Sequence, residues 1–220
     1  MINIVIIDEW FDILINEYIT KICSKTSNKL KAFSCVRNEL DHEQAKLLLN
    51  SFFFSSFSYC PLIWMFSGLG NNTQINRLHK RALQVLSNDF STDLRCLLEK
   101  HNTKTIHNQN VDKLVIEVYK IVNGFTPKFL RDFYKKKDIS HDFRKNNLLT
   151  FQTEREQTIL KGIDSLTFRG IQVWNKCDDV VKDCTCLEKV KISITGSNKK
   201  LCNCRMCQSL VYSGLWYLNI

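Results

Sequence analysis

Apolar residues recur every three or four positions along most of this chain, which is the spacing of one face of an α-helix. Between residues 9 and 35, Ile15, Ile19 and Ile22 follow this spacing, with lysines between and after them. Residues 1–7 alternate loosely and are rich in isoleucine, so a short strand is expected there. The pattern therefore predicts an N-terminal strand followed by a long helix.

The stretch from Leu47 to Phe66 carries no ionisable charge, and it is long enough to cross a bilayer as a helix. Asp41 is expected to cap a helix that runs into this stretch, with Gln44 in its first turn. Serines and Pro61 interrupt the apolar run, and the proline is expected to stop the helix. The pattern favours a buried core helix and a turn over a membrane span.

Further helices are expected along the rest of the chain, each introduced by a capping residue or a proline. Asn123 and Gly124 are expected to end one of them, because glycine readily adopts the left-handed conformation that closes a helix. A strand is expected near residues 158–160. The expected helix starts are Asn71 or Asn72, Ser91 or Thr92, Thr105, Pro127, and Asp164 or Ser165.

These elements predict a mainly α fold, a helical bundle with a small irregular, cysteine-containing tail. Composition divides the chain into a helical region at residues 1–137, a loop, strand and helix at 138–176, and a basic cysteine-rich tail at 177–220. The N-terminus lacks the positive start of a secretory signal. An intracellular, reducing location, cytoplasmic or nuclear, is therefore expected, with the cysteines as thiols or metal ligands rather than disulfides.

The formal net charge of +9 and the pI near 9.0 favour anionic partners, although a solvated basic surface gives the same composition. Two groups of basic residues are candidates for contacts to nucleic-acid phosphates. They are Arg77, Lys80 and Arg81 on one predicted helix, and the run Lys135, Lys136 and Lys137.

Five cysteines lie close together near the C-terminus, as CTC at 184–186 and CNCRMC at 202–207. A zinc ion needs about four thiolate or imidazole ligands, so a zinc site and a set of unligated thiols are both open interpretations. The candidate ligands are Cys202, Cys204, Cys207 and Cys186. Four other cysteines, at positions 23, 35, 60 and 96, are expected to be buried as small hydrophobic residues. The pair Asp178 and Asp179 is expected to form a helix-end turn or cap rather than a magnesium site.

Several segments, read in order, resemble a known family. They are YCPLIWMF (59–66), NRLHKRAL (76–83), LLEK (97–100), IHNQN (106–110), EVYKIVNG (117–124), Pro127, Ser165-Leu166 with Gly170, WN at 174–175, and CNCRMC (202–207). The set resembles the C-terminal part of a jockey-like non-LTR retrotransposon reverse transcriptase. The resemblance covers nearly the whole chain, from about residue 6 to residue 207.

This resemblance implies a fold like the helical thumb of the polymerase and its C-terminal extension. It implies that the chain binds RNA or DNA nonspecifically, as the template-primer duplex, and that it has no membrane role. It also implies that the missing palm region of a parent polymerase is a protein partner. The catalytic aspartate motif of the palm is absent, so magnesium belongs only to the full-length parent and no polymerase activity is expected from this chain alone. The alternative is a nonfunctional relic or a protein-interaction module without a nucleic-acid role.

Overall fold

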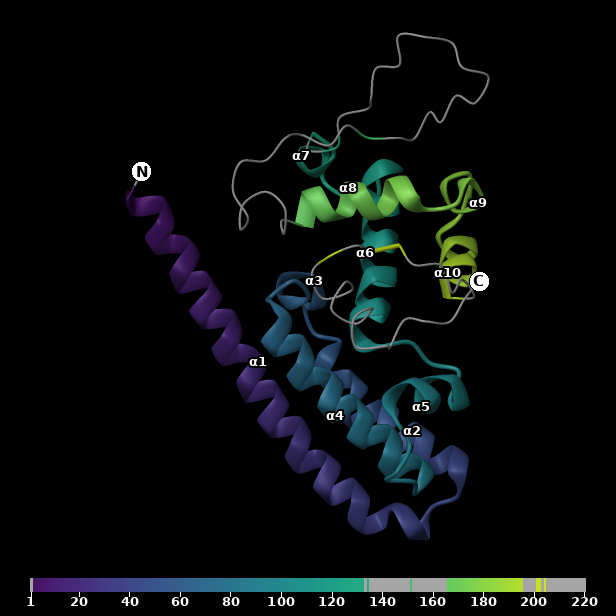
Figure 1. Ribbon diagram of the computed structural model, residues 1–220. Coiled ribbons are helices and arrows are strands. Elements are labelled where there is room, and N and C mark those ends of the chain that lie inside the picture. Colours follow the sequence, from purple (N-terminus) through teal and green to yellow (C-terminus); the bar gives the residue numbers. More distant parts are fainter. Residues whose placement is uncertain are drawn as a thin grey trace. The chain divides into compact units, whose positions relative to one another are not determined.

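The computed structural model describes residues 2–132, 134, 151, 166–195, 201, 202 and 204 (Figure 1). Helices dominate this part of the chain and it contains no strand, which confirms the mainly α prediction. The predicted strand at residues 158–160 lies outside the described residues. Two compact units are formed by residues 1–109 and 110–204, and the dividing point lies within helix α6.

The first unit contains α1 (Ile2–Val36), η1 (Arg37–Glu39), α2 (His42–Phe52), η2 (Phe54–Phe57), α3 (Pro61–Trp64), α4 (Leu69–Ser87) and α5 (Leu94–Lys100). α1 packs alongside α4 and also contacts α2 (Figure 1). The core of this unit is formed by buried side chains of α1, α2, η2, α3 and α4, together with the first residue of α6.

The N-terminal strand prediction is wrong, because α1 is one continuous helix from Ile2 to Val36. A strand needs a neighbouring strand to satisfy its backbone, whereas a helix satisfies its own backbone groups. The apolar spacing after residue 14 is regular and faces the core. The buried positions of α1 are Ile15, Ile19, Cys23, Thr26, Leu30 and Phe33.

The predicted cap of α2 is confirmed, because Asp41 and Gln44 form a capping box. The Gln44 backbone N–H donates to Asp41 Oδ1 at 2.8 Å, and the Asp41 N–H donates to Gln44 Oε1 at 3.3 Å. Pro61 does not end this helix, which already stops at Phe52. It instead begins α3, where its missing N–H costs nothing.

The charge-free stretch at residues 47–66 contributes to the core, but less than predicted, because most of it is partly or fully exposed, including Leu47, Tyr59 and Ile63. It is divided among α2, η2 and α3, and its buried members are Leu49, Phe53, Phe57, Trp64 and Met65. No helix in the described part of the chain combines the length and the apolar character needed to cross a bilayer. Burial of these aromatic side chains removes a large apolar area from water, which stabilises the first unit.

α4 begins earlier than predicted, with Gly68 as its N-cap, so Asn71 and Asn72 lie inside the helix. At its other end the helix is held by Arg37. The guanidinium donates to the Leu86 carbonyl through Nε at 2.9 Å and Nη2 at 2.8 Å, and its Nη1 donates to the Leu40 carbonyl at 3.0 Å. This fork satisfies carbonyl groups that a helix end leaves open.

α6 (Ile106–Val122) begins and ends as predicted. Thr105 Oγ1 accepts a hydrogen bond from the Asn108 N–H at 3.2 Å. Gly124 has a φ of +78°, and the Phe125 N–H donates to the Lys120 carbonyl at 2.9 Å. This bond, with the one from the Gly124 N–H to Ile121, forms a Schellman motif.

The second unit continues from α6 with α7 (Lys128–Arg131), α8 (Leu166–Lys176), α9 (Asp179–Lys182) and α10 (Leu187–Thr195). α6 and α8 approach closely at Gly170, and the Tyr119 hydroxyl donates to the Cys184 carbonyl at 2.9 Å. The Asn175 side chain makes two 3.0 Å hydrogen bonds to the backbone of Phe151. These contacts join segments that lie far apart in the sequence.

The tail is less irregular than predicted, because residues 187–195 form α10. Its sequence LEKVKISIT alternates like a strand, yet Val190 and Ile194 are buried and Ile192 is 74% exposed. Burial at positions four residues apart is the helical pattern. Asp178 is the N-cap of α9, as expected for a helix-end aspartate.

Candidate functional site

The three basic residues predicted on one helix all lie on α4. Arg77 and Arg81 are exposed and lie one turn apart, while Lys80 is partly buried. The opposite face of α4 carries the buried residues His79, Ala82 and Leu86, so packing of that face directs the arginines to the surface. α4 therefore presents cationic side chains outward.

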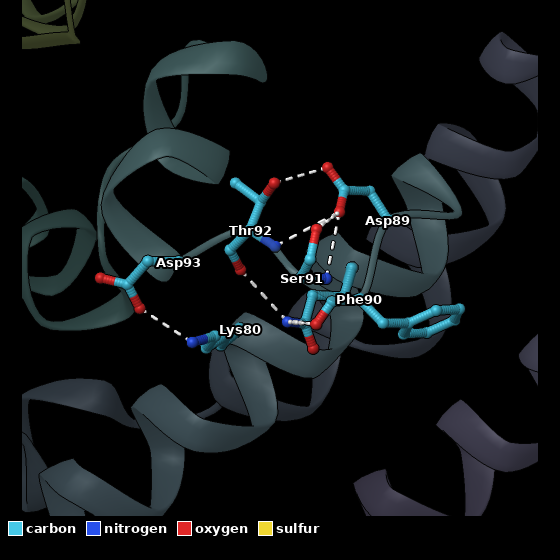
Figure 2. A network of polar contacts seen from close by, with 7 residues as sticks. Lys80, Asp89, Phe90, Ser91, Thr92 and Asp93 are labelled. Atoms are coloured by element: carbon cyan, nitrogen blue, oxygen red, sulfur yellow. Dashed lines mark hydrogen bonds and ion pairs between the residues drawn. The ribbon is translucent and has the colours of Figure 1, made fainter.

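Two of these three cations, Lys80 and Arg81, are already engaged by the loop that follows α4, and Figure 2 shows the contact of Lys80. Lys80 Nζ forms an ion pair with Asp93 Oδ1 at 2.8 Å, and this contact lowers the pKa of the Asp93 carboxyl. The Arg81 guanidinium lies 4.5 Å from the ring centroid of Phe90. Within the described part of the chain, Arg77 makes no hydrogen bond or ion pair, so it is the most available of the three.

The loop that holds Lys80 and Arg81 is well fixed. Asp89 accepts hydrogen bonds from the backbone and hydroxyl groups of Ser91 and Thr92, at 2.5 to 3.3 Å, and these bonds lower its pKa to about 2. Gln84 Nε2 donates to the Phe90 carbonyl at 2.9 Å and to the Thr92 carbonyl at 3.2 Å. Figure 2 shows these contacts converging on the turn between α4 and α5 (Leu94–Lys100).

The second predicted basic group, Lys135, Lys136 and Lys137, lies outside the described residues. Cys207 of the predicted metal site also lies outside them. Of the predicted phosphate-binding residues, the described part of the chain contains Arg77, Lys80 and Arg81, which all lie on α4.

Two of the predicted metal ligands, Cys202 and Cys204, are buried, and both lie in the second unit. Cys186 of the same unit is partly exposed. Thiolate sulfur is a ligand that zinc prefers.

His107, in the first turn of α6, was not singled out by the sequence. Its side chain is buried, and its ring centroid lies 6.0 Å from that of Phe66 in the same unit.

The prediction for the scattered cysteines is correct only for Cys23, which is buried and whose pKa burial raises to about 11. Cys35, Cys60 and Cys96 are exposed, contrary to expectation. Cys35 and Cys96 lie on the outer sides of α1 and α5, whose inner positions hold larger side chains such as Phe33 and Leu97, whereas Cys60 directly precedes α3.

Comparison of the chain with family models, curated proteins and solved structures finds no match.

Proposed function

We propose that this chain is the thumb-like, C-terminal part of a non-LTR retrotransposon reverse transcriptase, and that it binds RNA or DNA through phosphate contacts. The observation that carries the binding proposal is the outward placement of Arg77 and Arg81 on α4 in a chain of net charge +9. Arginine is suited to phosphate because its planar guanidinium donates several hydrogen bonds. The proposed activity is nucleic-acid retention without polymerisation.

The residues that carry the family resemblance have structural roles that support it. Gly124 ends α6, Gly170 allows α8 to approach α6, and Asn175 holds the backbone of Phe151. Asp178 and Asp179 lie at the start of α9, where a helix N-terminus favours carboxylates without any metal. These positions would keep their residue types in a polymerase extension even without a catalytic centre nearby.

Binding to a fluorescent oligonucleotide, measured by anisotropy across a salt series, tests this proposal. Arg77→Gln is expected to weaken binding and to reduce the slope of log affinity against log salt by about 0.7 to 0.9, because one phosphate contact is lost. Asp93→Asn is expected to strengthen binding, because it releases Lys80 from its ion pair. Thr73→Ala, a neutral change at an exposed position one turn before Arg77, is the matched control and should change nothing.

Two outcomes would contradict the binding proposal. One is an isolated chain without affinity at low salt, and the other is an affinity that does not depend on salt. If Asp93→Asn strengthened binding but Arg77→Gln had no effect, α4 would contact nucleic acid through Lys80 instead.

We also propose that Cys202 and Cys204, which are buried in the second unit, are ligands of a zinc ion, at about one ion per chain. Zinc prefers thiolate sulfur and imidazole nitrogen as ligands. Cys202→Ser and Cys204→Ser should each reduce the zinc content measured by elemental analysis at least severalfold. Cys35→Ser, at an exposed thiol of α1, should not reduce it. Zinc-free purified protein would remove the proposal.

A further inference from the structure

Two histidine side chains stack on each other in the first unit, outside the groups described above. The ring centroids of His42 and His101 lie 5.9 Å apart, and the ring planes are inclined by only 14°. His42 is the first residue of α2 and is exposed, while His101 follows the last residue of α5 and is partly exposed. Both rings can therefore be reached from solvent.

The position of the His101 ring is fixed by Ser87, the last residue of α4. Ser87 Oγ lies 2.5 Å from His101 Nε2. The preceding carbonyl, that of Leu86, is held by two hydrogen bonds from Arg37. A hydroxyl accepts from a protonated ring nitrogen as readily as it donates to a neutral one, so this contact survives protonation of the imidazole.

Further cationic groups flank the pair. Lys46 lies one helical turn after His42 on α2, and Lys100 directly precedes His101. Burial lowers the pKa of His101, and the charges of His42, Lys100 and Lys46 lower it further. The charges that lower the pKa of His101 are thus all positive, and its contact with Ser87 of α4 is to a neutral group.

The acidic residues nearest in sequence do not offset this charge fully. Asp41 and Glu43 flank His42 along the chain and give two negative charges against the four cationic groups His42, His101, Lys46 and Lys100. Glu99, two residues before His101, is paired with Arg95 at 3.4 Å. Arg37, from η1, is engaged with backbone carbonyls. Two stacked imidazoles beside two lysines repel one another once they are protonated, and a bound anion removes that repulsion.

We propose that His42 and His101, together with Lys46 and Lys100, bind a phosphate group, and that this contact tightens nucleic-acid binding as the pH falls. The assignment of this phosphate group to a nucleic acid rests on the proposed function. Free phosphate offers the same negative charge and the same hydrogen-bond acceptors. Because the anion favours the protonated imidazoles, binding takes up protons, and the affinity must then rise on acidification.

The test compares the wild-type chain with His42→Gln/His101→Gln at pH 7.5 and pH 5.5 and constant ionic strength. The probe is a fluorescent twenty-residue oligothymidine, because thymine does not titrate in this range. Acidification is expected to strengthen oligothymidine binding by the wild-type chain about tenfold more than binding by the variant. A tenfold difference in affinity corresponds to a change of about one unit in the pKa of a group that takes up a proton on binding. Circular dichroism at both pH values checks that both proteins stay folded.

Lys25→Gln on α1 is the control, because it removes an exposed positive charge and no imidazole. It should weaken binding by the same factor at both pH values. If the double variant and the wild-type chain show the same pH dependence, the inference is overturned while the proposed function stands.

A second measurement separates this inference from the proposed function. Inorganic phosphate is titrated into both proteins at pH 5.5, and the histidine ring proton signals are followed by NMR. Saturable shifts of two histidines that are absent in the variant would support the site even if oligothymidine did not bind. Absence of both oligothymidine binding and phosphate-dependent shifts would overturn the site and the proposed function together.

Discussion

Replacing Gly170 by valine is expected to destabilise the second unit by about 3 kcal/mol, because the side chain has no space. A Cβ at this position of α8 would lie 2.8 Å from Tyr134 Oη, 3.2 Å from Val118 Cγ2 and 3.7 Å from Leu114 Cδ1. Tyr134 is buried against Phe151, and burial raises the pKa of its phenol to about 12. Urea unfolding followed by circular dichroism measures the loss.

Gly70→Ala is the matched control for this prediction. Gly70 also lies in a helix, α4, but nothing lies within 4 Å of its missing Cβ. Alanine there should be neutral or stabilising by up to about 1 kcal/mol, since it is the better helix former.

A double-mutant cycle identifies the clash itself. Tyr134→Phe removes the hydroxyl that is closest to Gly170, so Gly170→Ala should cost about 1 kcal/mol less in that background. Equal costs in the two backgrounds would show that the hydroxyl does not limit the approach of α8 to α6.

Acidification is expected to destabilise the first unit through His79. This side chain is fully buried on α4, with ring centroids 6.1 Å from that of Phe53 and 5.2 Å from that of Phe54. Burial lowers its pKa from 6.5 to about 3. The unfolded chain therefore binds the proton first, so stability is lost as the pH falls from about 6.5 towards 3. Between pH 7.5 and pH 5.0 this one group should cost about 2 kcal/mol.

His79→Leu is expected to remove this pH-dependent loss. Within the described part of the chain neither ring nitrogen of His79 has a hydrogen-bond partner, so at pH 7.5 the leucine variant should be within about 1 kcal/mol of the wild type. Urea unfolding at both pH values measures the difference. Asn76→Leu is the control, because it removes another buried polar group of α4 that does not titrate. If His79→Leu loses as much stability on acidification as the wild type, His79 is not the group responsible.

The local signals in the sequence were reliable where the cause is local. A capping carboxylate satisfies backbone groups within its own helix, so Asp41 and Thr105 could be recognised without knowing the fold. The same holds for Gly124, because only its own backbone conformation requires glycine. Apolar spacing likewise predicted the buried stripe of α1 and the mainly helical class.

Competing local signals were decided by packing. Residues 1–7 and 187–195 both have strand-like composition, yet both belong to helices, α1 and α10. β-propensity reflects packing on a sheet, and the described part of the chain provides none. Pro61 was read as a helix stop, whereas the fold uses it as a helix start.

The sequence by itself determined the helical class, the positions of the main caps and the basic character of α4. Only the tertiary structure decided that Asp93 and Phe90 engage Lys80 and Arg81, and that His42 stacks on His101. The reason is physical. Caps and helical faces depend on neighbours within about one turn, whereas a charge or a ligand acquires its function from residues that the chain brings back from far away.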